Sequence, residues 1–182
     1  MKTMRTLIIA VLLLSAVVWS APRRDPLTQA EIEQMRETAM DPERRLPLII
    51  EFARLRLANV ERMRSDPRMA ADRGVRVHDL LEDFTRLIDE LGDNIDQFTR
   101  YNADIRKPLK LVIEAQNEFQ IKLRSIKATQ NDAVFGKEYR DYAFVVDSAI
   151  EAVTASLEDN RKLLQEQEAL AAEKKLRKLT PP

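Results

Sequence analysis

The sequence predicts an all-α fold, an elongated antiparallel three-helix bundle with coiled-coil-like long helices. Charged residues make up 33% of the chain, whereas glycine occurs only three times in 182 residues, a composition typical of long helices. No stretch alternates apolar and polar residues as a half-buried strand would. Apolar residues instead recur every 3.5 residues along the central segment, which is the spacing of a left-handed helical seam.

The chain begins with a segment that predicts export. Basic residues precede an apolar run at residues 7–19, which as a helix is roughly 20 Å long, too short for about 30 Å of bilayer hydrocarbon. We therefore interpret residues 1–20 as a signal peptide cleaved after Ser20, the alternative being an uncleaved anchor. The mature protein would be periplasmic or secreted and would start with a flexible N-terminal segment, residues 21–27.

A short first helix is expected at about 29–40. Thr28 and Glu31 have the spacing of a capping box, in which each side chain bonds the other residue's backbone amide. Leu27 and Ile32 have the spacing of a hydrophobic staple across the same start. These residues together fix where the helix begins.

A second helix is expected at about 42–64. Asp41 is a suitable cap and Pro42 suits the first turn. Pro47 leaves open a regular helix that starts five residues later. The apolar face of this helix consists of Leu46, Ile50, Ala53, Leu57 and Val60.

The central segment predicts one long helix, about 76–127. Pro108 lies within its seam without shifting the phase, which favours a single kinked helix; the alternative is a tight turn at residues 102–108. All but two positions of the seam are apolar. The seam consists of Val77, Leu81, Phe84, Ile88, Leu91, Ile95, Phe98, Asn102, Ile105, Leu109, Val112, Gln116, Phe119, Leu123 and Ile126.

A last helix is expected at about 137–177, after turn residues near 129–136. If it folds back about Asn131, Asn102 lies opposite Asn160, and a mutual hydrogen bond between them would fix the antiparallel register. The alternative is that each asparagine reaches water near a helix end.

The predicted domain organisation is a single helical domain, residues 28–177, followed by a tail, residues 178–182. The last helix ends in a basic cluster, which suits the negative end of a helix dipole and forms a possible docking patch. The cluster consists of Lys174, Lys175, Arg177 and Lys178.

The carboxylates between Val77 and Arg100 raise the question of a metal site. With Leu81 at heptad position a, they fall at positions b, c and f, directed away from the seam, whereas metal sites in bundles use inward Glu and His ligands. The single His of the chain, His78, has only Glu82 at helical spacing. We therefore expect no metal, catalytic or cofactor-binding residues and no enzyme. The carboxylates are Asp79, Glu82, Asp83, Asp89, Glu90, Asp93 and Asp96.

Charge and composition narrow the class of partner. The chain has 30 basic and 30 acidic residues, which argues against binding to nucleic acid. It has no cysteine, so an exported domain must be stable without disulfides. We expect a non-enzymatic interaction or scaffold module of the cell envelope with an unknown protein partner. A second copy of the chain could close the seam, and membrane association is possible without being favoured.

The stretch LTQAEIEQMRE, residues 27–37, resembles the Leu-Thr-x-x-Gln helix starts of small stress-induced periplasmic helical chaperones, with Glu31 in place of the Gln. Because the capping box alone accounts for these residues, no function is transferred from the resemblance. A chaperone-like protein for unfolded clients, or a binder of membrane or wall surfaces, is the alternative function. Exposed Leu48, Phe52 and Leu55 would favour it, and their burial under the first helix would favour the scaffold.

Overall fold

The computed structural model describes residues 25–70, 72–132 and 135–179. This part of the chain is helical and contains no strand, so the all-α prediction is confirmed. The predicted signal peptide and cleavage site, residues 21–24 and residues 180–182 lie outside the described residues. The helices are α2 (Gln29–Glu37), α3 (Pro42–Ser65), α4 (Arg73–Arg100), α5 (Arg106–Ala128) and α6 (Gly136–Leu179), with short 3₁₀ turns η2 (Pro67–Met69) and η3 (Thr129–Asn131).

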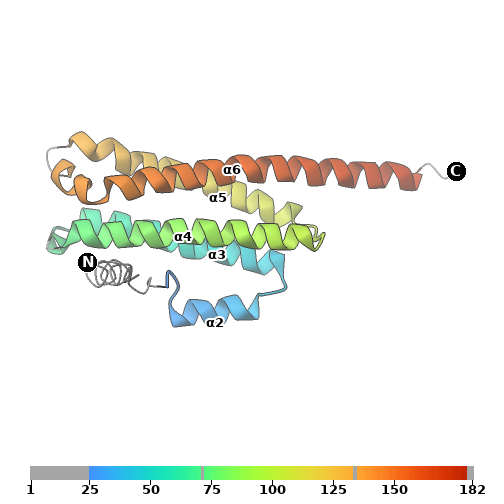
Figure 1. The fold of residues 1–182 in the computed structure, drawn as a ribbon, viewed down its shortest axis with the longest axis horizontal. Coiled ribbons are helices and arrows are strands. Elements are labelled where there is room, and N and C mark those ends of the chain that lie inside the picture. Colours follow the sequence, from blue (N-terminus) through green and yellow to red (C-terminus); the bar gives the residue numbers. More distant parts are fainter. Residues whose placement is uncertain (1–24, 71, 133–134, 180–182) are drawn as a thin grey trace, which may run out of the picture.

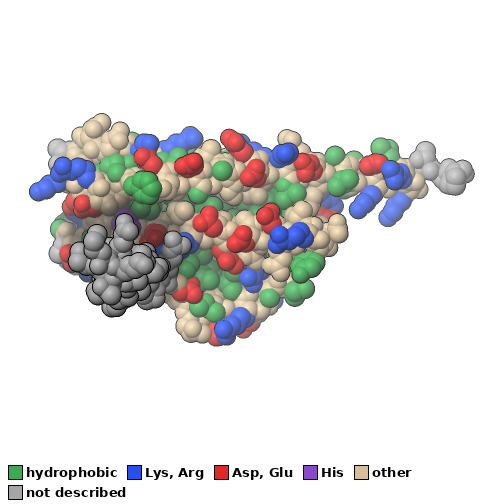
Figure 2. Space-filling model, viewed as in Figure 1, with side chains coloured by type: hydrophobic (Ala, Val, Ile, Leu, Met, Phe, Trp, Pro, Cys, Tyr) green, Lys and Arg blue, Asp and Glu red, His purple; other side chains and the backbone are tan. Residues whose placement is uncertain are grey.

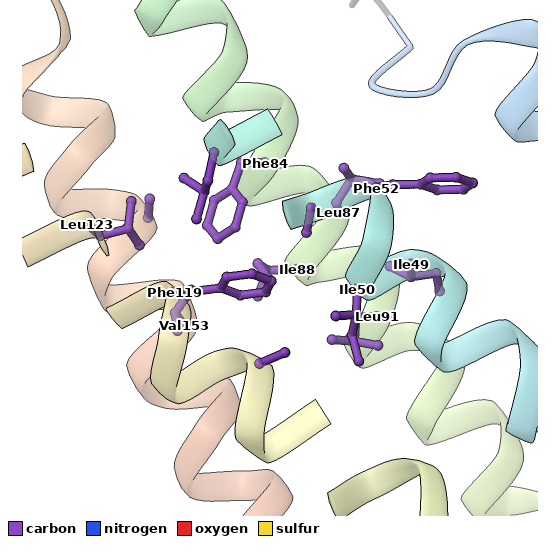
Figure 3. Close-up of a cluster of buried hydrophobic side chains, with 14 of the residues drawn as sticks. Ile49, Ile50, Phe52, Phe84, Leu87, Ile88, Leu91, Phe119, Leu123 and Val153 are labelled. Atoms are coloured by element: carbon purple, nitrogen blue, oxygen red, sulfur yellow. The ribbon is translucent and has the colours of Figure 1, made fainter. Parts of the chain in front are cut away.

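Helices α3 to α6 form a bundle of two antiparallel hairpins, α3–α4 and α5–α6 (Figure 1). Helix α3 packs against α4 and α5, and α6 packs against the same two helices, so α4 and α5 lie diagonally across the bundle. The diagonal pair meets through Phe84 and Phe119, whose ring centroids are 5.3 Å apart in an edge-to-face contact. Figure 3 shows these two rings facing each other in the apolar interior.

The predicted single helix at 76–127 is wrong, because the chain reverses between Arg100 and Arg106. Asn102 adopts a left-handed conformation with φ 54°, which asparagine tolerates better than most residues. The Ala103 amide donates to the Phe98 carbonyl at 3.0 Å, and the Asn102 amide donates to the Thr99 carbonyl at 2.9 Å. These two bonds form a Schellman motif, which ends α4.

Pro108, interpreted from the sequence as a kink, is the third residue of α5. At that position the helix requires no amide donor, so proline costs nothing there. The tight turn that the sequence left as the alternative is therefore correct. The long helix becomes two antiparallel ones, and the bundle has four helices instead of three.

The predicted seam is nevertheless the core. Every one of its apolar residues is buried, because the turn keeps the phase of the pattern and returns α5 with its apolar stripe toward the same interior. Helix α3 begins at Pro42 and continues through Pro47, so the later start is not used. The buried stripe of α3 consists of Leu46, Ile49, Ile50, Ala53, Leu57 and Val60.

The predicted register between α5 and α6 is wrong. Gln120 donates to Thr154 at 2.9 Å, about three turns further along α6 than the predicted neighbour Tyr142. Asn160 donates to Gln116 at 3.1 Å, so its partner is the other polar residue of the seam and not Asn102. The shift arises because the first turns of α6 run past the end of α5 and pack on the start of α4.

Candidate interaction surfaces

The prediction that the carboxylates of α4 all point away from the core is wrong for Asp83, which is 7% exposed and lies near Arg56 of α3. The other six are exposed or partly exposed. The His78 ring nitrogen Nδ1 lies 3.6 Å from Asp79, and Glu82 accepts from Arg86 at 2.7 Å. Among the described residues, no three His, Asp or Glu side chains lie close enough together to hold a metal ion. Figure 2 shows acidic side chains gathered over α4 on the visible face.

Two open grooves flank this acidic face. One, of about 730 Å³, lies between α2 and α4 and has Leu27, Ile32 and Leu87 beside the carboxylates. The other, of about 530 Å³, lies between α4 and α6. Asp89 lines both grooves, and burial, followed by the nearby charge of Asp93, raises the pKa of its carboxyl above the ordinary value. Arg36, Arg45 and Arg86 also line the first groove, which therefore carries both signs of charge. The described residues that line the second groove include aspartates and no basic side chain.

Helix α2 is anchored to the bundle by a buried ion pair. Arg56 of α3 donates to both carboxylate oxygens of Glu31, at 2.8 and 2.6 Å, and to the Pro26 carbonyl at 2.7 Å. Glu31 also accepts from the Thr28 amide at 2.7 Å, completing the predicted capping box. Burial alone would raise the pKa of Glu31, but the hydrogen bonds from Arg56 and Thr28 outweigh it, so the pKa lies below its ordinary value.

The far end of α2 has a second arginine anchor. Arg45 donates to the Met35 carbonyl at 2.6 Å and also to the Asn94 side chain of α4. A guanidinium at this place satisfies a carbonyl in the last turn and suits the negative end of the helix dipole. The two arginines of α3 therefore hold both ends of α2.

The three apolar residues of α3 whose exposure separates the scaffold from the alternative functions differ from one another. Phe52 is 6% exposed and belongs to the same buried cluster as Met35 of α2, and Figure 3 shows its ring directed away from the bundle interior. Leu48 is partly buried against the core, whereas Leu55 is 49% exposed. Burial of the largest of the three under α2 favours the scaffold over a permanently sticky surface.

A second arginine–glutamate pair lies where α3 ends and α4 begins, at the end of the bundle toward which Arg56 also lies. Arg73 at the start of α4 donates to both carboxylate oxygens of Glu138 in α6, each at 2.7 Å. Its hydrogen bond lowers the pKa of Glu138 below the ordinary value. The buried rings of Tyr139 and Tyr142 lie 5.4 Å apart in the same region, so this pair is built into the packed end of the bundle.

Helix α6 runs past the end of the bundle (Figure 1). Near the end of the bundle, Gln167 accepts from the Ile105 amide at 3.2 Å and Glu168 pairs with Lys110 at 2.8 Å. Further along α6, the charge of Lys174 adds to the hydrogen bonds from Arg106 in lowering the pKa of Asp104. Leu170, Leu176 and Leu179 lie beyond Glu168 and are 55, 65 and 69% exposed. We call Glu168–Leu179 the α6 extension; it also bears the predicted basic cluster.

Sequence reasoning missed both arginine–glutamate pairs. The capping box accounts for Glu31 without a further partner, and Arg73 lies between two predicted helices, about 42–64 and about 76–127. Arg56 carried a usable signal, because it lies three residues after Ala53 and four before Val60, inside the apolar stripe of α3. An arginine in such a stripe requires a buried acidic partner.

No protein-family model, curated protein or solved structure is significantly similar to this chain. Within the described residues, no helix combines the length and the apolar character needed to cross a bilayer.

Proposed function

We propose that this chain is a non-enzymatic interaction module of the cell envelope that docks a protein partner along the α6 extension. The observation that carries the proposal is the extension itself. It is the last part of a helix of 44 residues, which at 1.5 Å per residue is roughly 66 Å long, and it runs past the end of the bundle (Figure 1). Every residue from Ala172 to Leu179 is exposed, and continuity with the packed part of α6 supports this part of the helix.

The surface of the α6 extension indicates the chemistry of the partner. Three leucines are more than half exposed, and the segment has two acidic and four basic residues. Lys174 and Lys178 continue the line of α6 that is apolar within the bundle, so the inward face becomes basic where the bundle ends. A partner with an acidic rim around an apolar surface would cover both features.

Photo-cross-linking in the native envelope tests the proposal. A photoreactive residue replaces Leu176, and captured proteins are identified by mass spectrometry. We expect one partner at fixed stoichiometry and, for Lys174→Gln with Lys178→Gln, a yield reduced about tenfold, since about 1.4 kcal/mol of electrostatic attraction corresponds to that factor. The matched control, Lys137→Gln with Arg140→Gln at the other end of α6, should leave the yield unchanged. Equal loss in both variants, or no partner at fixed stoichiometry, contradicts the proposal.

A chaperone-like function is the second candidate, and the apolar face of α3 under α2 supports it. Phe52 and its neighbours could bind an unfolded client only when α2 is displaced. Capture of many unrelated unfolded exported proteins, instead of one partner, would favour this function over a dedicated module.

A further inference from the structure

Helix α2 is attached to the bundle differently from every other described helix. It buries only two residues, Glu31 and Met35, and both of its ends are held by arginines of α3. A groove of about 730 Å³ lies along its side toward α4, and another of about 400 Å³ lies at its N-terminal turn. Hollows on this scale mean that α2 touches the bundle at anchor points and not along a continuous apolar seam.

The four-helix bundle does not need α2 for its interior. The apolar seam of α4 and α5 is closed by α3 and α6, and the Phe84–Phe119 contact lies among those helices. Residues 38–41 are the only covalent link between α2 and α3. The interior can therefore stay packed while α2 leaves its place.

We propose that α2 is a detachable clasp, released when Glu31 is protonated, and that its release uncovers the α3 face around Phe52 while α3 to α6 remain folded. This conformational device is separate from docking along the α6 extension. It supplies a condition under which the buried face of α3 becomes accessible.

The charges around Glu31 explain why protonation releases the clasp. A neutral Glu31 leaves the Arg56 guanidinium buried without its bidentate partner, which is costly in a buried site. Asp83 of α4 attracts Arg56 and would retain it on the bundle side when α2 departs. The other charged groups that line the hollow at this end are Asp25 before α2 and Arg76 and Asp79 of α4.

The sign of the pH dependence follows from the ion pair. The pKa of Glu31 lies below its ordinary value of 4.5 in the folded protein, so the pair stabilises the docked helix above pH 4.5. This stabilisation is lost as the pH falls below that value. Release is therefore expected in acid and not at neutral pH.

Hydrogen exchange read by mass spectrometry tests the clasp, with protection factors corrected for the intrinsic effect of pH. In the wild-type protein, the amides of residues 32–37 should be protected at pH 7 and lose protection progressively as the pH is lowered below 4.5, while those of α5 stay protected. Glu31→Gln keeps the capping box, because glutamine serves at that position, but removes the charge. It should lower the protection of residues 32–37 about 100-fold already at pH 7.

The matched control is Glu138→Gln, which breaks the other bidentate pair and should leave α2 as protected as in the wild type at pH 7. Three results would overturn the proposal: unprotected α2 amides in the wild type at pH 7, loss of protection in α2 and α5 together on acidification, or wild-type protection of α2 in Glu31→Gln. Circular dichroism establishes that both variants are folded.

Discussion

Two regions of the molecule, the attachment of α2 and the start of α6, use the same chemical device with different consequences. Arg56–Glu31 and Arg73–Glu138 are both bidentate, with N–O distances between 2.6 and 2.8 Å. The first joins the bundle to a helix that buries one apolar side chain. The second joins α4 to the start of α6, where Tyr139 and Tyr142 are buried beside it.

The difference teaches that the effect of an ion pair depends on what moves when it breaks. Loss of Arg56–Glu31 frees nine residues and uncovers one face of α3. Loss of Arg73–Glu138 cannot free the start of α6 without opening the core, because the helix is continuous with the buried stripe through Val153 and Leu157. The first pair should therefore govern local opening, and the second should govern global unfolding.

The largest expected effect comes from matched Phe→Ala substitutions in the two regions. Phe119→Ala removes a ring that is 0% exposed and should lower the free energy of unfolding by about 4 kcal/mol. Phe52→Ala removes a ring under α2 and should lower it by less than half of that, because α2 can settle over the gap. Urea denaturation followed by circular dichroism measures both; equal losses would mean that α2 is part of the cooperative core.

Next in size are the two arginines, each replaced by methionine. Arg73→Met leaves Glu138 without its partner at the packed end and should lower the free energy of global unfolding by about 2 kcal/mol. Arg56→Met should lower the protection of α2 amides while shifting the urea midpoint very little. A larger shift of the midpoint for Arg56→Met than for Arg73→Met would reverse the comparison.

The smallest effect is expected from a third pair, Asp104–Arg106, which lies in the turn and is largely in water. The hydrogen bonds from Arg106 lower the pKa of Asp104 to about 2, so its contribution is present above pH 3.8 and is lost as the pH falls toward 2. Because Asp104 is 62% exposed, Asp104→Asn should change the free energy of unfolding by no more than about 0.5 kcal/mol. NMR titration measures the pKa; a change above 1 kcal/mol would show that exposure does not separate this pair from the buried two.

The sequence was sufficient for the caps and for the buried positions. The Thr28 hydroxyl accepts from the Glu31 amide at 3.3 Å, and Asp41 accepts from the Glu43 amide at 3.0 Å, as their spacing predicted. The apolar seam is buried because an interval of 3.5 residues fixes which side of a helix meets its neighbours. Local rules of this kind need no knowledge of the tertiary arrangement.

The break in the long helix was harder to predict, because the turn spans one heptad. Phe98 is the last buried seam residue of α4 and Ile105 is buried at the start of α5, so a periodic pattern passes through the reversal without a gap. Asn102, which adopts a left-handed conformation, was the residue that indicated the turn. Its place in the seam made it resemble a single polar position among apolar ones. Where asparagine interrupts a seam, a Schellman turn competes with a buried hydrogen bond.

The register between α5 and α6 and the Arg56–Glu31 pair could not be predicted, for a related reason. The place of Gln120 opposite Thr154 depends on how far the first turns of α6 overhang α5, and nothing in the local pattern of α6 encodes that overhang. The Arg56–Glu31 pair joins residues 25 positions apart, on helices whose relative placement was unknown. Only the unusual position of Arg56 within the apolar stripe of α3 indicated this pair.

The hairpin arrangement of the bundle also has a kinetic meaning. The antiparallel partners α3 and α4 are neighbours in the chain, as are α5 and α6, so much of the packing joins segments close together in sequence. Chains with such short-range topology fold on the fast side of the known range. We expect α3 and α4 to pair while α5 is still being synthesised, so that the growing polypeptide keeps little apolar surface exposed to aggregation at any moment.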